Sequence, residues 1–151
     1  MALKPGDQAP TFRLPDQDGT AVSLGDFAGR KLLLYFYPKD DTPGCTTEAC
    51  QFNDARQRFV DRGVAVIGVS ADDGESHRRF RAKYGLEFPL LSDDGGQVAT
   101  TYGAWGEKTY GEQTFTGVLR STFLIDEQGR IEQAWYDVAP DGHPEAILAG
   151  I

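Results

Sequence analysis

The chain has 151 residues, of which 40% are hydrophobic and 25% charged. This composition predicts a single folded domain over residues 1–151 and argues against disorder. The 15 basic and 23 acidic residues give a formal net charge of −8, which disfavours nucleic acid and anionic membranes as partners. No apolar run approaches the roughly 20 residues of a membrane span. The first residues lack the apolar region of a signal peptide, so a cytoplasmic location is expected.

The N-terminal third of the sequence predicts three strands. Two short strands over residues 11–14 and 20–24 flank Asp18 and Gly19, a pair that is typical of hairpin turns. A continuous apolar run follows over residues 32–37. Such a run predicts a strand that is buried on both faces of a sheet.

A helix and another buried strand are expected next. Over residues 46–62, apolar side chains recur at three- and four-residue spacing, which predicts a helix. Thr46 or Thr47 would cap its start, and Gly63 would end it. The apolar stretch over residues 64–70 predicts the second buried strand.

The rest of the chain continues to alternate strands and helices. The predicted elements are a charged helix over 75–84, a strand over 88–91, a short helix over 95–102, a strand over 121–126, its antiparallel partner over 131–138 and a last helix over 143–148. No element is predicted in the long Gly- and Thr-rich connection that leads to residue 121. The order predicts an α/β fold, with helices flanking a central mixed sheet and an N-terminal hairpin. A cysteine at a strand-to-helix junction makes this order typical of a thioredoxin-like fold.

The two cysteines of the sequence, Cys45 and Cys50, are too few for a disulfide scaffold and are catalytic, metal-binding or incidental. Cys45 falls in the first turn of the predicted helix, where unpaired N–H groups and the helix dipole favour a thiolate. Thr42 can place a hydroxyl beside its sulfur. A zinc site would need two more ligands, and His77 and His143 lie in polar segments where surface exposure is expected. No metal is therefore predicted.

The spacing of the two cysteines restricts how they can react with each other. Five residues along a helix separate the two Cα atoms by roughly 8.5 Å, whereas a disulfide requires about 4.4–6.8 Å. Cys45 and Cys50 therefore cannot be bridged while the helix is intact. If they form a disulfide, the first turns of the helix must unwind.

The segment around Cys45 resembles a known family. Pro38, Thr42 and Cys45 have the spacing of the peroxiredoxin active-site signature, and residues 37–50 as a whole are similar to the bacterioferritin-comigratory (Q-type) subfamily. The resemblance covers nearly the whole chain, because it continues through residues 68–70, 88–93, 102–108 and 120–126.

The resemblance implies a thiol peroxidase that reduces hydrogen peroxide and organic hydroperoxides and protects the cell against oxidative stress. Cys45 corresponds to the peroxide-attacking cysteine, which becomes a sulfenic acid. Thr42 would bind the peroxide, Arg120 would stabilise the thiolate and orient the peroxide, and Pro38 would shield the pocket. Cys50 corresponds to the resolving cysteine, so the redox disulfide would join it to Cys45. Thioredoxin or a similar dithiol would reduce this disulfide. A monomer without cofactors is expected.

Two other classes of protein remain open from the residues themselves. A redox-sensing or chaperone-like binding protein could use the same disulfide to switch a surface, and it would oxidise once without turnover. A thioredoxin-fold binding module would carry two unreactive thiols as small buried side chains. A thioredoxin-type oxidoreductase is disfavoured because its two cysteines are separated by two residues. Glu48 either positions Arg120 or serves only as an acidic residue near the helix start.

Overall fold

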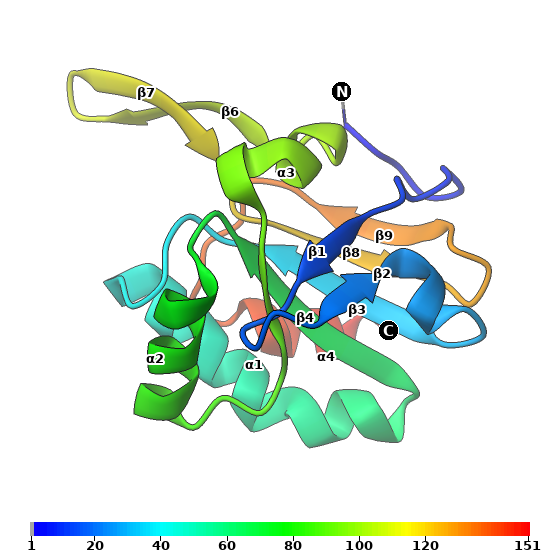
Figure 1. The fold of residues 1–151 in the computed structure, drawn as a ribbon. Helices are drawn as coiled ribbons and strands as arrows, with labels where there is room; N and C mark the ends of the chain where they lie inside the picture. The colour runs from blue at the N-terminus through cyan, green and yellow to red at the C-terminus, as the bar shows by residue number, and fades with distance from the viewer. Residues whose placement is uncertain (1) are drawn as a thin grey trace.

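A five-stranded mixed sheet forms the centre of the protein (Figure 1). The computed structural model describes residues 2–151, apart from the side chain of residue 110. The strand order is β5 (Leu90–Ser92), β4 (Val64–Ser70), β3 (Lys31–Phe36), β8 (Ser121–Ile125) and β9 (Ile131–Trp135). The first three strands are mutually parallel, whereas β8 runs antiparallel to β3 and β9 antiparallel to β8. The predicted central mixed sheet is confirmed.

Both faces of this sheet are buried, which explains the unbroken apolar run of β3. Leu33 and Tyr35 face one core, and Leu32, Leu34 and Phe36 face the other. The first core is covered by α1 (Pro43–Asp61), α2 (Gly74–Tyr84) and α4 (His143–Ala149). The second core is covered by the 3-10 helix η1 (Leu24–Phe27), by α3 (Gln97–Thr101) and by N-terminal residues. Figure 1 shows α3 and the N-terminal strands on the side of the sheet opposite α1 and α4.

The N-terminal hairpin is also confirmed. It pairs β1 (Arg13–Pro15) with β2 (Ala21–Ser23) in antiparallel register. A short 3-10 helix, η2 (Asp94–Gly96), leads into α3, where one short helix was predicted. The strand β5 begins two residues later than predicted. Pro89 has no N–H to give to a ladder, and its carbonyl accepts a single bond from the Gly68 N–H at 3.1 Å.

The prediction for the start of the cysteine-bearing helix is wrong by one turn. The helix α1 begins at Pro43, and its N-cap is Thr42 rather than Thr46 or Thr47. Proline suits the first helical position, because its fixed φ is helical and its missing N–H has no helical partner to lose. The end is as expected: Gly63 follows the helix with a φ of 74°, a conformation that glycine adopts at little cost.

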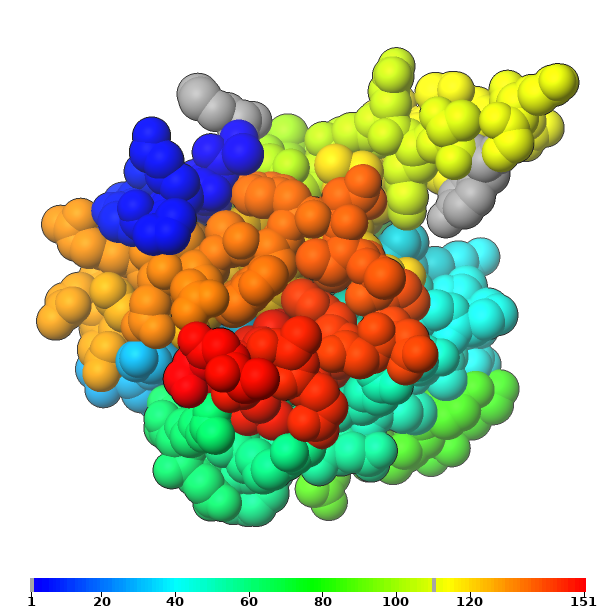
Figure 2. Space-filling model, turned by 180° about the vertical axis from the view of Figure 1, so that it is seen from behind, coloured from blue at the N-terminus to red at the C-terminus, as the bar shows by residue number. Residues whose placement is uncertain are grey.

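The connection before residue 121, for which no element was predicted, contains a hairpin. The strands β6 (Trp105–Tyr110) and β7 (Gln113–Val118) pair only with each other. Figure 2 shows this hairpin projecting beyond the rounded body of the molecule. Alternate backbone groups of each strand bond to the other strand, and the remaining groups face outward from this two-stranded sheet.

Both histidines are buried, so the prediction of surface exposure is wrong. His77 is 0% exposed, and its ring nitrogens contact Asp40 Oδ2 at 2.7 Å and the Leu91 carbonyl oxygen at 3.0 Å. His143 is 7% exposed and lies 2.8 Å from the Thr122 hydroxyl oxygen. Burial, helped by the positive charge of Arg120, lowers the pKa of His143 to about 4, so this ring is neutral at pH 7. Hydrogen-bond partners thus face both ring nitrogens of His77 and Nε2 of His143.

None of the helices within residues 2–151 combines the length and the apolar character that crossing a bilayer requires. Nor do three or more Cys, His, Asp or Glu side chains gather there in a way that could hold a metal ion.

Candidate active site

Cys45 lies at the carboxyl end of β3, where the chain turns into α1. It is the third residue of the helix and is 2% exposed. The first turn of α1 contains no acidic residue, so the N–H groups at this end have no carboxylate from that turn beside them. An anion at this position is favoured by these N–H groups and by the helix dipole. The structure thus places Cys45 in the first turn of the helix.

Arg120 reaches Cys45 from the segment between β7 and β8. Its Nη2 donates to Cys45 Sγ at 3.4 Å, and its Nη1 donates to Glu48 Oε1 at 2.8 Å. The Val138 N–H donates to the Arg120 carbonyl at 2.9 Å and fixes the backbone. Burial disfavours the charge of Arg120, but Glu48 and Cys45 outweigh it and raise the pKa of the guanidinium. The structure thus brings together a fixed cation and the predicted nucleophile.

Gly44 makes room for this guanidinium. A Cβ atom on residue 44 would lie 3.2 Å from Arg120 Nη2 and 3.4 Å from Cγ of Pro140. The first distance is tighter than most contacts of a Cβ atom, so a larger residue would require the guanidinium to shift by a few tenths of an ångström. Glycine at this position therefore eases the close approach of Arg120 to Cys45.

Glu48 occupies a buried position behind the arginine. Its side chain is 0% exposed, and its Oε2 lacks a hydrogen-bond partner among the described residues, as does the hydroxyl of Tyr35. Burial raises the pKa of Glu48 to about 7, against the opposing effect of Arg120. A buried carboxylate is costly unless it is paired, and Arg120 supplies the partner, so Glu48 does more than complement the helix dipole. It holds one nitrogen of Arg120 while the other faces the sulfur.

Pro38 and Thr42 lie beside the same cavity as Cys45 and Arg120. The cavity has a volume of about 510 Å³. The Thr42 hydroxyl donates to the Lys39 carbonyl at 2.9 Å, so its hydrogen is directed toward its own loop rather than toward the sulfur. The four side chains predicted for peroxide binding and activation therefore meet at one cavity.

Two residues of the β6–β7 hairpin also line this cavity, and they were not predicted from the sequence. Lys108 and Phe115 are directly opposite each other in the hairpin register. Burial and the nearby charge of Arg120 lower the pKa of Lys108. The two-residue connection Gly111-Glu112, with Gly111 at a φ of 62°, is a turn signal that could have predicted the hairpin.

Cys50 lies outside this cluster, five residues further along α1. Both cysteines are free thiols, and Cys50 is half-buried. Burial raises the pKa of the Cys50 thiol, and the nearby carboxylate of Asp54 adds to the effect. Cys50 is therefore a thiol at neutral pH. The unbroken helix keeps the two residues apart, as its geometry requires.

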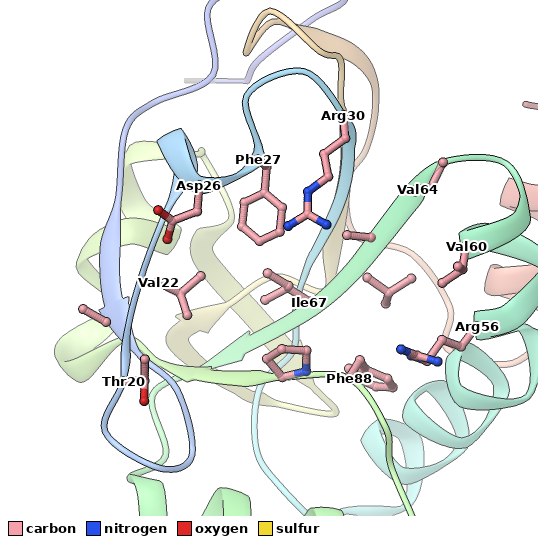
Figure 3. Close-up of a pocket in the computed structure, with 15 residues that line it drawn as sticks. Thr20, Val22, Asp26, Phe27, Arg30, Arg56, Val60, Val64, Ile67 and Phe88 are labelled. Carbon is pink, nitrogen blue, oxygen red and sulfur yellow. The ribbon is translucent and has the colours of Figure 1, made fainter.

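A second cavity, of about 660 Å³, lies between β2, the end of α1 and the start of β4 (Figure 3). The side chains labelled there are mostly apolar, with Asp26, Arg30 and Arg56 at the edges. The Arg30 guanidinium lies 4.8 Å from the centre of the Phe27 ring, and Arg56 pairs with Glu87 at 3.8 Å. Among the described residues that line this cavity, none is a predicted site residue.

Comparison with known proteins identifies the family. The model of the AhpC/TSA family matches residues 5–134. Peroxiredoxin Bcp of Escherichia coli is 47% identical over 97% of this chain and 94% of its own. The structure of Xylella fastidiosa PrxQ superposes with a TM-score of 0.92 at 37% identity, covering 99% of this chain and 96% of that one. Bacterioferritin comigratory protein of Xanthomonas campestris, whose structures were studied for alkyl peroxide reduction, has a TM-score of 0.86 at 40% identity, covering 92% and 88%.

These relatives decide between the enzyme and the binding proteins that the sequence left open. The predicted family, the thioredoxin-like fold and the enzyme class are confirmed. The chain therefore belongs to the AhpC/TSA family, within which it is a peroxiredoxin of the Bcp or Q type and a thiol peroxidase.

Proposed function

We propose that Cys45 is the nucleophile of this peroxidase. Its thiolate attacks one oxygen of a hydroperoxide, the O–O bond breaks, and the leaving alkoxide or hydroxide takes a proton to become an alcohol or water. Cys45 is oxidised to a sulfenic acid. The single observation that carries this proposal is the Arg120 Nη2, which lies 3.4 Å from Cys45 Sγ at the start of α1.

The activating residues have distinct parts in this step. Arg120 stabilises the thiolate and the charge that moves onto the peroxide oxygens as the O–O bond stretches. The Thr42 hydroxyl binds the peroxide once its hydrogen turns away from the Lys39 carbonyl. Pro38 covers the cavity and excludes water. A thiolate, a donor and a fixed cation suffice for this chemistry, so the proposal includes no metal or organic cofactor.

Cys50 is proposed as the resolving residue. Its thiol attacks the sulfenic sulfur of Cys45, one water molecule leaves, and an intramolecular disulfide forms. The first turns of α1 must unwind before the sulfur atoms can meet. A thioredoxin-type dithiol then reduces the disulfide by exchange and is itself oxidised.

Hydrogen peroxide and organic hydroperoxides are the proposed substrates. The cavity of about 510 Å³ is far larger than hydrogen peroxide, since a water molecule occupies roughly 30 Å³ of liquid volume. The remaining space can accept an organic group, and alkyl peroxide reduction was studied for the Xanthomonas campestris relative. We further propose that residues 1–151 form a single domain that acts as a cytoplasmic monomer in protection against oxidative stress. No nucleic acid or membrane partner is proposed.

The intact mass of the pre-reduced protein after one equivalent of hydrogen peroxide tests the proposal. We expect rapid loss of two hydrogens, with peptide mapping that joins Cys45 to Cys50. Cys45→Ser should abolish turnover with thioredoxin, whereas Cys50→Ser should keep one round of oxidation without the intramolecular disulfide. Full steady-state activity of the Cys45→Ser protein, or an unchanged wild-type mass after minutes, would overturn the assignment.

A further inference from the structure

The loop between β3 and α1 is attached to α2 by two consecutive aspartates that face opposite directions. Asp40 faces inward. Its carboxylate accepts bonds from the Tyr37 hydroxyl at 2.5 Å and the Ser76 hydroxyl at 2.8 Å, and it lies 2.7 Å from His77 Nδ1. Its own N–H donates to Asp72 Oδ2 at 2.8 Å. Because this network is buried and hydrogen-bonded, it fixes the loop up to residue 40.

Asp41 faces outward and makes a separate attachment. Its carboxylate accepts a bond from Lys83 Nζ at 2.8 Å and another from the Tyr84 hydroxyl at 2.7 Å. These hydrogen bonds from Lys83 and Tyr84 lower the pKa of Asp41. The side chains of Asp41 and Lys83 are 40% and 59% exposed, so the contact can open without disturbing the core.

The backbone of Asp41 adopts a left-handed conformation in this arrangement. Its φ is 56°, in the left-handed region that residues other than glycine, asparagine and aspartate seldom occupy. Aspartate adopts this conformation with the help of hydrogen bonds made by its short side chain. Lys83 and Tyr84 of α2 bond the Asp41 carboxylate, and a smaller hydrogen-bond contribution that lowers the pKa of Asp41 comes from the side chain of Thr46 in α1.

Asp41 lies between a fixed segment of the loop and the helical turn that must unwind. Asp40, on one side, is fixed by the buried network. Thr42, on the other side, is the N-cap of α1, whose first turns must unwind before Cys45 can reach Cys50. Unwinding of this turn would move the backbone of Asp41. The bonds of the Asp41 carboxylate to Lys83 and Tyr84 oppose that movement.

We propose that Asp41, held by Lys83 and Tyr84, is a positioning residue that sets how fast the first turn of α1 unwinds. It thereby divides the Cys45 sulfenic acid between two reactions. In one, Cys50 attacks, water leaves and the disulfide forms. In the other, a second hydroperoxide oxidises the sulfenic acid to a sulfinic acid and is reduced to an alcohol or water. This inference rests on the proposed roles of Cys45 and Cys50.

The Lys83→Gln/Tyr84→Phe double variant tests the inference, because it removes the positive charge of Lys83 and the hydroxyl of Tyr84 and keeps Asp41. Pre-reduced protein is mixed with hydrogen peroxide, alkylated at timed intervals and analysed by mass. We expect Cys45 oxidation to stay within about twofold of wild type, disulfide formation to become roughly three- to tenfold faster, and the sulfinic fraction at high peroxide to fall. Arg79→Gln is the matched control: it breaks an exposed ion pair with Glu75 on the same helix and should behave as wild type.

Each outcome bears on a different claim. Equal rates of disulfide formation in the double variant and the wild type would overturn the inference, as would parallel changes in both oxidation steps. A wild type that forms no disulfide would overturn the proposed function and the inference with it. Asp41→Asn gives an independent version of the test, since asparagine tolerates the left-handed backbone but lacks the charge that Lys83 binds. It should accelerate disulfide formation in the same direction.

Discussion

Replacing Arg120 by methionine is expected to slow the oxidation of Cys45 strongly. The change removes the donor that lies 3.4 Å from the sulfur and keeps much of the apolar volume of the side chain. A hydrogen bond that involves a charged group contributes about 1.5–3 kcal/mol. At 1.36 kcal/mol for each factor of ten, the second-order rate constant with hydrogen peroxide should fall roughly 10- to 150-fold.

Because Glu48 is the buried partner of Arg120, the experiment needs controls that separate the rate from the stability. Arg120→Met leaves the Glu48 carboxylate without the bond that it now receives at 2.8 Å, so the free energy of unfolding should also fall. The double variant Arg120→Met/Glu48→Gln should recover part of that stability but none of the rate. Arg130→Met, which replaces an exposed arginine at the turn before β9, should match wild type in both measurements.

Rapid mixing followed by alkylation and mass analysis gives the rate constant, and urea unfolding gives the stability. A folded Arg120→Met protein that reacts within twofold of wild type would refute the role of the guanidinium. The same conclusion would follow if the double variant recovered the rate together with the stability, because the rate loss would then be a folding defect.

Three further predictions concern the neighbours of Arg120. Gly44→Ala should slow peroxide reduction several-fold, because a Cβ 3.2 Å from Arg120 Nη2 displaces the guanidinium. The melting temperature should not fall, since alanine favours the helix. An unchanged rate would show that the distance between residue 44 and Arg120 is unimportant. Thr42→Val should lower kcat/KM for hydrogen peroxide by roughly tenfold, and Thr42→Ser should restore it; equal activity of all three proteins would exclude the hydroxyl. Burial raises the Glu48 pKa from its ordinary 4.5 to about 7, so the folded state binds this proton more tightly than the unfolded state. The stabilisation is complete below pH 4.5 and is lost as the pH rises through 7. Urea unfolding should therefore show wild type losing roughly 3 kcal/mol relative to Glu48→Gln between pH 4 and 8, and parallel curves would contradict the buried carboxylate.

The fold could be predicted best where burial dominates the sequence pattern. The strand over residues 64–70 was predicted with its observed bounds because both of its faces are covered. The start of α1 was missed because apolar spacing becomes visible only after the first turn, whereas Pro43 and the N-cap Thr42 carry no such spacing. Boundaries set by backbone geometry are therefore harder to predict than the elements themselves.

The residues of the site that could not be predicted depend on contacts between distant segments. His77 belongs to a helix rich in charged side chains, so its sequence neighbours indicate exposure. Its burial follows from Asp40, which lies 37 positions away. Lys108 and Phe115 reach the cavity only because β6 and β7 pair with each other. By contrast, Cys45 and Arg120 were predicted from local motifs, and the structure brings them together.

The β6–β7 hairpin contributes to the wall of the cavity but is not part of the central sheet. It supplies Lys108 and Phe115 to the cavity wall, yet its strands pair only with each other and project from the body (Figure 2). We expect substitutions at these two positions to alter the size and charge of the entrance while the central sheet stays in place. The range of accepted peroxides should then change at little cost in folding free energy.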